Sequence, residues 1–259
     1  MAKRHGIKLH ALTVMYNHIH DVVTDPDANI IEFYRDSHSN IAKAINCHFG
    51  REGNLWNTNK PNRLDCVTRD AVVDKIAYAM ANPVAAFLVQ KGYQWPGIRM
   101  AWPAKPQTIK RPNFYFRSPD KGGNWPDEVV LNLERPPDFT ELGDEELATR
   151  IEQETLVREE AARSKAKRKG IQFLGRRALK RVSRYSCPKN KVQWFQVVPV
   201  VAGKDIDARK ARILENQAWF RDYQSALVRF VAGERDVVFP YGTYKLPRHY
   251  GVQVEAIPV

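Results

Sequence analysis

Two short runs of alternating polar and apolar residues near the start of the chain constrain its fold more than any other feature. Residues 7–14 partly alternate, and residues 18–23 alternate again after a turn at Tyr16 and Asn17. Two runs of this period joined by a short turn predict an antiparallel β-hairpin. Every second side chain of a strand points to the same side, so His18 and His20 are expected on one face of this hairpin.

The following residues carry the three- and four-residue spacing of amphipathic helices. One helix is expected from about Pro26 to Phe49, and a short strand at 64–67. A second helix follows, for which either Thr68 or Asp70 can serve as the N-cap. This order of elements indicates a mixture of helix and antiparallel sheet in the first hundred residues.

The second helix is predicted to present two different faces. Asp74, Tyr78 and Asn82 are spaced four residues apart and therefore form a polar stripe. Pro83 disfavours helical geometry in the residue before it, so the helix is expected to break or kink at Asn82. The apolar face of the same helix consists of Val73, Ile76, Ala77 and Met80.

The rest of the chain divides into a β-rich part and a helical part. Residues 96–140 contain several prolines and two β-like runs, at 113–117 and 128–133. Helices are expected at about 144–169 and at about 207–231, the second with Ile213, Phe220, Tyr223, Leu227 and Phe230 facing inward. The fold class is therefore α+β, with a first unit at 1–99, a β-rich connector at 100–140 and a helical extension at 141–259.

Positive charge is concentrated in one segment. The chain carries a net charge of +12, and residues 163–191 contain twelve Lys and Arg without one Asp or Glu, which equals the entire excess. Apolar residues interrupt the run, so it need not be a disordered tail. A solvated helix end or a targeting signal would also explain it, but an excess of this size indicates a polyanionic partner, with nucleic acid as the default.

Composition excludes several classes of protein. No apolar run reaches the roughly 18–20 residues that a bilayer span needs, so no membrane contact is expected. The three cysteines are scattered, which argues against a zinc ribbon and against a disulfide framework. The sequence is typical of a cytoplasmic protein in a reducing compartment.

Two motifs together suggest a chemistry. Histidines two apart on a strand can bind one cation, although many such pairs arise by chance. Here the run Met15-Tyr16-Asn17-His18-Ile19-His20 precedes Tyr78-Ala79-Met80-Ala81-Asn82-Pro83-Val84 by about sixty residues. The pair of motifs, in this order, resembles the single-tyrosine HUH transposases, and the REP-associated tyrosine transposase group in particular. Residues 92–96 and 233–240 are similar to later segments of that family.

The resemblance implies a ferredoxin-like HUH endonuclease core in residues 1–99 and a metal-dependent transposase that nicks and rejoins single-stranded DNA. Tyr78 would be the catalytic nucleophile and form a 5′-phosphotyrosine. His18, His20 and Asn82 would bind Mg²⁺ or Mn²⁺. Expected partners are single-stranded DNA with hairpin ends and, as one possibility, a second copy of the chain. The expected location is the bacterial cytoplasm, in association with the nucleoid. The predicted DNA contacts are Lys165, Lys167, Arg168, Lys169, Arg176, Arg177, Lys180, Arg181 and Arg184.

The proposed site residues also have plainer interpretations. Tyr78 could simply pack its ring in the core. Asn82 directly before Pro83 is a good N-cap for a following segment, and one amide could not easily serve as both cap and metal ligand. Asp74 lies on the same stripe but could be an ordinary solvated helix residue.

Family members usually have a strand and a helix before the histidine hairpin, and the first strand has no counterpart here. Residues 1–5 are expected to be the last helical turn, with Gly6 as its cap. Without the strand, one edge or the centre of the sheet would lack a partner. A start assigned too late, a decayed or repurposed copy, or a dimer that supplies the strand would each explain this difference.

Two alternatives to an active enzyme remain. A truncated or domesticated copy would bind nucleic acid through residues 163–191 without forming any covalent adduct. An unrelated RNA-binding or structural protein would leave the paired motifs unexplained, but aromatic residues could then stack on bases. The candidates for such stacking are Trp95, Trp102, Tyr115 and Trp125, although most of them are expected in the core.

Overall fold

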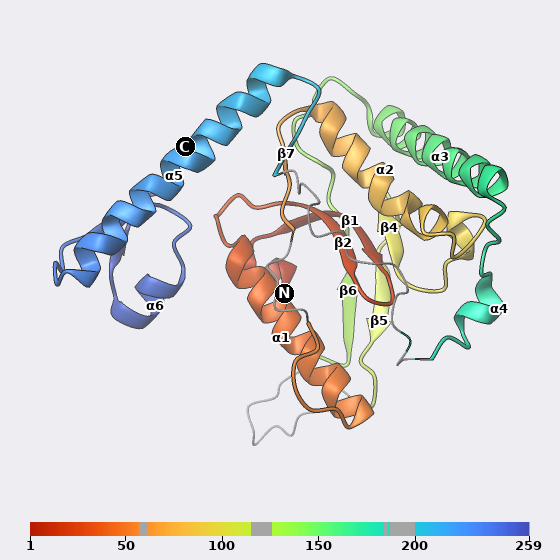
Figure 1. Cartoon of the computed structure of the whole chain (residues 1–259), viewed down its shortest axis with the longest axis horizontal. Coiled ribbons are helices and arrows are strands. Elements are labelled where there is room, and N and C mark those ends of the chain that lie inside the picture. Colours follow the sequence, from red (N-terminus) through yellow and green to blue (C-terminus); the bar gives the residue numbers. More distant parts are fainter. Residues whose placement is uncertain (57–61, 115–125, 184–185, 187–199, 259) are drawn as a thin grey trace.

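The structure is a computed structural model that describes residues 1–56, 62–114, 126–183, 186 and 200–258. It is a mixed α+β fold with small sheets, which confirms the expected class. A three-stranded sheet lies near the centre, helices α2 and α3 lie side by side next to it, and the long helix α5 extends away from it (Figure 1). The predicted Tyr115, Trp125 and Arg184 fall outside the described residues.

The central sheet contains the predicted hairpin. Strands β1 (Lys8–Val14) and β2 (Ile19–Thr24) are antiparallel, and β4 (Arg99–Ala101) pairs with the other side of β1. The amide of Met15 donates to the carbonyl of His18 at 2.9 Å, which closes the turn at Tyr16 and Asn17 as predicted. Within the described ranges, no strand pairs with the outer side of β2.

Two helices contact opposite faces of β2. Helix α1 (Ile30–Phe49) begins four residues later than expected, because the Asp25 carboxylate accepts from the amides of Asn29 and Ile30. The Tyr34 hydroxyl of α1 donates to Asp21 at 3.0 Å. Adjacent strand residues point to opposite sides, so His20 faces the other way, toward α2 (Arg69–Ala85).

Helix α2 starts where Thr68 accepts from the amide of Ala71 at 3.3 Å, so the N-cap is Thr68 rather than Asp70. Of the predicted break or kink at Asn82, the break is wrong, because α2 continues through Pro83 to Ala85. An interior proline costs about 3 kcal/mol, and full burial of one valine side chain returns roughly 1.5–3 kcal/mol. Pro83 and Val84 are both fully buried, so packing offsets the lost hydrogen bond.

The main core joins the sheet to α2 and to α3 (Asp144–Lys169), whose bounds agree with the predicted helix. Its buried members come from the first unit, the connector and the extension, so the core crosses both of the expected boundaries. These members are Leu9, Ala11, Val73, Ile76, Met100, Ala101, Trp102, Leu133, Phe139, Leu147 and Ile151.

A buried ion pair fixes α3 to the sheet and to the end of α2. Glu159 of α3 is only 4 % exposed, and its carboxylate accepts from Arg99 of β4 at 3.0 Å and from the amide of Gly92 at 3.1 Å. Arg99 also donates to the Met80 carbonyl at 2.6 Å. A Cβ at position 92 would collide with Arg99 and Glu159, so the short helix η2 (Gly92–Gln94) requires glycine there.

The remaining strands are short and differ in part from the predictions. The connector hairpin pairs β5 (Gln107–Lys110) with β6 (Glu128–Leu131), so its first strand lies before the predicted run at 113–117, of which residues 115–117 are not described. Strand β3 (Asp65–Cys66) pairs with β7 (Val201–Ala202), and β8 (Val238–Phe239) pairs with β9 (Gln253–Val254).

The last helices form a small unit with its own core. In α5 (Ile206–Val231), Tyr223, Leu227 and Phe230 pack against β8, as expected. Ile213 and Phe220 were expected to face inward, but they are 38 % and 56 % exposed, because the small core of this unit includes Tyr223, Ala226, Leu227 and Phe230 of α5 and reaches neither of them. Also described are η1 (Ala2–His5), capped by Gly6 as predicted, α4 (Arg176–Leu179) and α6 (Lys245–Tyr250). None of the described helices combines the length and the apolar character needed to cross a membrane.

Candidate functional site

Three predicted site residues meet on one face of the hairpin. The ring centroids of His18 and His20 lie 4.7 Å apart, and those of His20 and Tyr78 lie 5.4 Å apart, with the rings nearly perpendicular in both pairs. His18 belongs to the turn just before β2, whereas His20 is in the strand. Tyr78 projects from α2 and is 45 % exposed, so its ring packs on His20 without being enclosed in the core.

Asn82 also lies at this site. It is buried in the last turns of α2, one helical turn after Tyr78, and its side chain acts on both imidazoles. No new helix begins after it, so its predicted alternative role as an N-cap is wrong. The two motifs, sixty residues apart in the sequence, therefore contribute to one cluster of His18, His20, Tyr78 and Asn82.

The environment lowers the pKa of both imidazoles. Burial lowers the pKa of His18, and hydrogen bonding to Asn82 partly opposes this shift. Burial, with a smaller contribution from the charge of His18, lowers the pKa of His20 to about 4, again opposed by Asn82. A neutral imidazole offers a lone pair to a metal ion, and a protonated one does not.

The tautomer of His18 also suits metal binding. Its Nδ1 lies 2.7 Å from Oδ1 of Asn17, and since that oxygen only accepts, this contact favours the tautomer with the proton on Nδ1 and the lone pair on Nε2. A second partner that fixes one ring nitrogen is the usual arrangement for histidines that bind metal through the other nitrogen. The sequence analysis gave Asn17 no role beyond the turn; its position next to the first histidine was the only available signal.

Two buried polar atoms on this face have no hydrogen-bond partner. They are Nε2 of His20 and Oγ1 of Thr13, and these residues are paired across β1 and β2 in the register. Leaving a buried polar group unpaired costs about 1–3 kcal/mol, so such atoms mark a place where a ligand is expected. Sequence analysis had no means of finding Thr13, because its importance comes only from its strand partner.

These residues fit a divalent cation with an incomplete protein ligand set. His18, His20 and the amide oxygen of Asn82 supply nitrogen and oxygen donors, which suit transition metals such as Mn²⁺ and leave positions for substrate. Among the described residues there is no group of three or more His, Cys, Asp or Glu that could hold a metal. A site here would therefore depend on the asparagine and on oxygen atoms from outside the chain.

Asp74, the third member of the predicted polar stripe, is not part of the cluster's chemistry. Burial tends to raise the pKa of its carboxyl, but the neighbouring Lys75 and Arg158 cations outweigh this and lower it. Nζ of Lys75 lies 3.0 Å from Oδ2 of Asp74, and Arg158 of α3 donates to Oδ1 of the same carboxylate. Asp74 therefore serves to join α2 to α3.

The basic segment lies against the same end of the sheet. The hydroxyl of Tyr16 donates to the Leu179 carbonyl of α4 at 2.9 Å, and the amides of Leu174 and Gly175 donate to the carbonyls of Phe87 and Leu88 just after α2. The sequence analysis had placed this segment outside the catalytic unit. Side chains buried together explain the docking: Met15, Val84, Val89, Trp95, Ala162 and Leu179 form a second core cluster.

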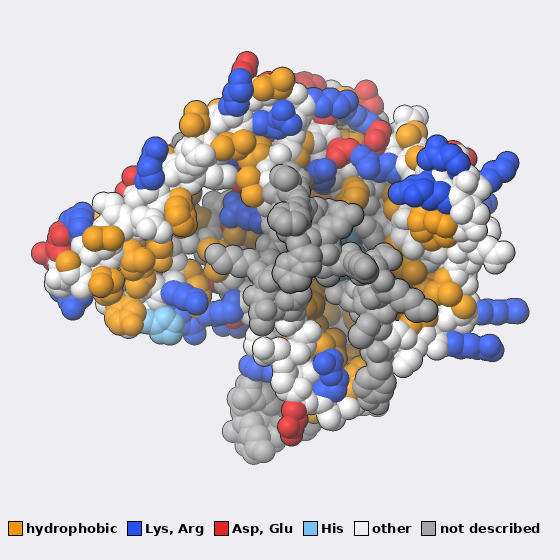
Figure 2. Space-filling model, viewed as in Figure 1, with side chains coloured by type: hydrophobic (Ala, Val, Ile, Leu, Met, Phe, Trp, Pro, Cys, Tyr) orange, Lys and Arg blue, Asp and Glu red, His pale blue; other side chains and the backbone are white. Residues whose placement is uncertain are grey.

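The predicted DNA contacts on this segment are exposed. Figure 2 shows lysine and arginine side chains projecting around the end of α3 and α4. Within the described part of the chain, none of them forms an ion pair, whereas Arg163 is held by Glu159 and Glu160. The exposed, unpaired cations are Lys165, Lys167, Arg168, Lys169, Arg176, Arg177, Lys180 and Arg181.

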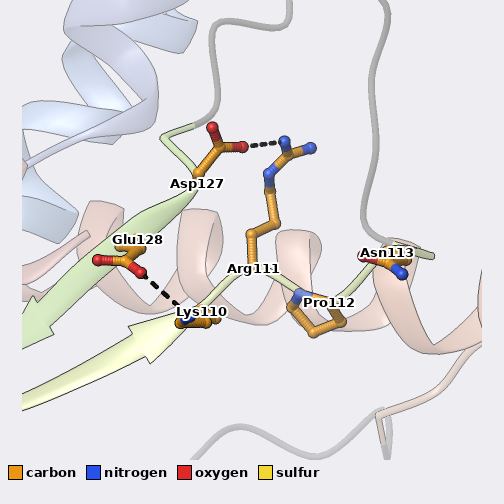
Figure 3. Close-up of a pocket in the computed structure, with 6 residues that line it drawn as sticks. All are labelled: Lys110, Arg111, Pro112, Asn113, Asp127 and Glu128. Atoms are coloured by element: carbon orange, nitrogen blue, oxygen red, sulfur yellow. Dashed lines mark hydrogen bonds and ion pairs between the residues drawn. The ribbon is translucent and has the colours of Figure 1, made fainter.

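Two other candidate surfaces do not qualify as functional sites. Trp95 and Trp102 are 8 % and 9 % exposed, so both are core residues, as expected for most of these aromatic residues, and neither can stack on a base. A hollow at the end of β5 and β6 lies apart from the histidines, and its cations face carboxylates: Lys110 pairs with Glu128, and Arg111 pairs with Asp127 (Figure 3).

Comparisons of the chain with protein-family models, with curated proteins and with solved structures find no match.

Proposed function

We propose that this chain is a metal-dependent endonuclease and strand transferase of the single-tyrosine HUH type, with a ferredoxin-like core, that acts on single-stranded DNA. The observation that carries the proposal is the cluster itself. The ring of Tyr78 lies 5.4 Å, between centroids, from the ring of His20, whose buried Nε2 has no hydrogen-bond partner, and the ring of His18 lies 4.7 Å from that of His20. The pattern of the two motifs supports the same family.

His18, His20 and Asn82 would hold the cation, Mg²⁺ or Mn²⁺. When bound, such a cation withdraws charge from a phosphate and stabilises the negative charge that grows during attack on it. The low pKa of His20 keeps this one imidazole in its metal-binding, neutral form near neutral pH. Asn17 holds the ring of His18 in the tautomer that leaves Nε2 free.

Tyr78 performs the covalent step. Its Oη forms a bond to the scissile phosphorus, the bond from phosphorus to the 3′ oxygen breaks, and a 5′-phosphotyrosine and a free 3′-OH result. The hydroxyl proton of Tyr78 passes to water, and the departing 3′ oxygen takes up a proton in turn. The phosphodiester energy is retained in the covalent intermediate, so a second 3′-OH can reverse the step and rejoin DNA without ATP.

The exposed cations at the end of α3 and on α4 support DNA as the substrate. Each Lys or Arg that neutralises a phosphate releases counterions, which makes binding strongly dependent on salt. Because α4 is docked beside the hairpin turn, a strand that follows these cations would lead to His18 and His20. This surface also supports the second candidate function, a non-catalytic DNA-binding protein of the same ancestry.

Adduct formation separates these two candidates. The chain is incubated with single-stranded hairpin DNA and Mn²⁺, and a covalent protein–DNA adduct is detected under denaturing conditions. The wild-type chain and Tyr93→Phe, which changes another exposed tyrosine, are expected to form it, and Tyr78→Phe is not. An adduct that persists in Tyr78→Phe would refute the assignment of the nucleophile. DNA binding without any wild-type adduct would favour the non-catalytic alternative.

A salt titration tests the basic surface. Replacing Lys167, Arg168, Arg176 and Arg177 by alanine should flatten the dependence of log affinity on log salt by up to about four phosphate contacts, since the slope per contact is roughly 0.7–0.9. The matched control removes four exposed cations that lie elsewhere: Lys43, Lys105, Lys204 and Arg209. Equal slopes for the two variants would show that DNA binds another surface.

A further inference from the structure

The turn of the histidine hairpin carries an aromatic side chain that is exposed and yet firmly held. Tyr16 is 58 % exposed, although its hydroxyl donates to the Leu179 carbonyl at 2.9 Å. Its ring meets the Trp95 ring at 5.4 Å with an angle of 77° between the planes. One side of the phenol is therefore fixed by contacts, and the rest of the ring is left in water.

The residues behind Tyr16 are rigid. Trp95 is 8 % exposed, and its indole N–H donates to the Val14 carbonyl at 3.1 Å. Leu179 is 1 % exposed, and its carbonyl also accepts from the amide of Val182 at 3.2 Å. A ring held against such neighbours loses little conformational entropy when a ligand packs on it.

Cations and the proposed active site flank this ring. Arg176, Arg177, Lys180 and Arg181 are exposed on α4 and the turn after it, and Lys180 directly follows the residue that Tyr16 binds. His18 follows Tyr16 by two residues in the hairpin turn, so the proposed metal-binding residues are also close to this ring. An aromatic ring beside a row of unpaired cations is the arrangement that binds single-stranded nucleic acid, with bases stacked on the ring and phosphates against the charges.

The hydrogen bond to the Leu179 carbonyl accounts for the hydroxyl group of Tyr16, because it connects α4 to the hairpin. It does not explain why a large apolar ring is placed in solvent at the point where the cations and the histidines meet. We infer that Tyr16 is a stacking platform for one unpaired base of the DNA strand, next to the phosphate at His18 and His20. This inference rests on the proposed function and adds a subsite to it.

The platform selects for unpaired DNA. A base inside a duplex is already stacked on both faces, so only a single-stranded or extruded base can use the ring. Stacking depends on the face of the base and not on its hydrogen-bonding edge, so this subsite should accept any base and reject an abasic position.

The test measures binding of labelled single-stranded oligonucleotides by full-length Tyr78→Phe protein without divalent metal, so that no cleavage can occur. Tyr16→Leu should weaken binding by about 5- to 150-fold, the range for loss of one base–aromatic stack. Tyr16→Phe, which keeps the ring, should retain most of the affinity. The matched control is Tyr250→Leu, which changes a similarly exposed tyrosine on α6, at the opposite side of the molecule from α4 (Figure 1).

A scan of single abasic positions along the oligonucleotide completes the test. At one position, the abasic strand should bind wild-type Tyr16 as weakly as the normal strand binds Tyr16→Leu. Equal losses for Tyr16→Phe and Tyr16→Leu would overturn the inference, because the hydroxyl tie to α4 would then be the only role. Unchanged affinity in Tyr16→Leu, or an equal loss in Tyr250→Leu, would overturn it as well.

These results are independent of adduct formation. If Tyr16 and the abasic position show the expected loss while the wild-type chain forms no adduct, the stacking subsite stands and the endonuclease proposal fails. If the adduct forms but Tyr16→Leu binds DNA with normal affinity, the endonuclease proposal is supported and the stacking role of Tyr16 is refuted.

Discussion

Two histidines on neighbouring strands differ in the hydrogen bonding of their ring nitrogens. His10 of β1 is 1 % exposed, and both ring nitrogens are satisfied, by the Glu134 carbonyl and by the Thr24 hydroxyl, each at 2.8 Å. His20 of β2 is also largely enclosed, but its Nε2 has no partner and its ring lies beside another histidine and a tyrosine.

The difference separates a histidine with a structural role from the one proposed here to bind a metal ion. Burial lowers the pKa of both residues, so the shift alone does not distinguish them. What distinguishes them is the partner of Nε2. At His10 the Nε2 atom accepts from the Thr24 hydroxyl, whereas Nε2 of His20 is buried without a hydrogen-bond partner.

The largest expected effect is on the chemistry of the His20 region. His20→Ala should slow adduct formation with Mn²⁺ by about a thousand-fold or more, because charge stabilisation by a bound cation is worth several kcal/mol. The free energy of unfolding should fall by less than it does in His10→Ala, because Nε2 of His20 has no hydrogen-bond partner to lose. Single-turnover kinetics and urea denaturation measure the two quantities, with the exposed His249→Ala as control. Normal kinetics in His20→Ala would remove the basis of the comparison.

The reverse outcome is expected at His10. His10→Ala should lower the free energy of unfolding by about 2–4 kcal/mol, because it leaves a cavity and two unpaired polar partners. The rate of adduct formation per folded molecule, measured at low temperature, should stay within about two-fold of wild type. A large loss of activity without loss of stability would show that His10 belongs to the functional region.

The pH dependence of stability tests the satisfied state of His10. Burial lowers its pKa in the fold, with Lys8 lowering it further and the Glu134 interactions opposing. As pH falls below the unfolded value of about 6.5, the unfolded chain binds the proton first and stability is lost. This loss approaches about 1.4 kcal/mol per pH unit for one proton. Between pH 6.5 and 5, His10→Gln should show a shallower decline than wild type, and parallel curves would contradict this.

The smallest expected effect is stabilisation of the His20 region by metal. At ten times its dissociation constant, Mn²⁺ should add about 1.4 kcal/mol and raise the Tm by roughly 2–4 °C in a chain of this size. Tyr78→Phe should keep this shift, and the double variant His18→Ala/His20→Ala should lose it. An equal shift in the double variant would place any metal elsewhere, and no shift in wild type would argue against a resident cation.

Local pattern was enough to predict several of the elements that carry the candidate site. Alternation placed the turn at Tyr16 and Asn17, and four-residue spacing put Tyr78 and Asn82 on one side of a helix. The errors arose where distant contacts outweigh local preference. Pro83 continues a helix because its neighbourhood is buried, and Phe220 is exposed because the last unit is too short to cover it.

The sequence by itself determined the hairpin, the shared face of His18 and His20, and the concentration of charge, since these follow from residue order and strand or helix period. Only the tertiary structure decided that His10 is satisfied and His20 is not, because their partners come from residues far apart or across the strand. It likewise decided that the basic segment docks beside the hairpin turn. That docking depends on Leu179, Trp95 and Met15 being buried together, which no local pattern encodes.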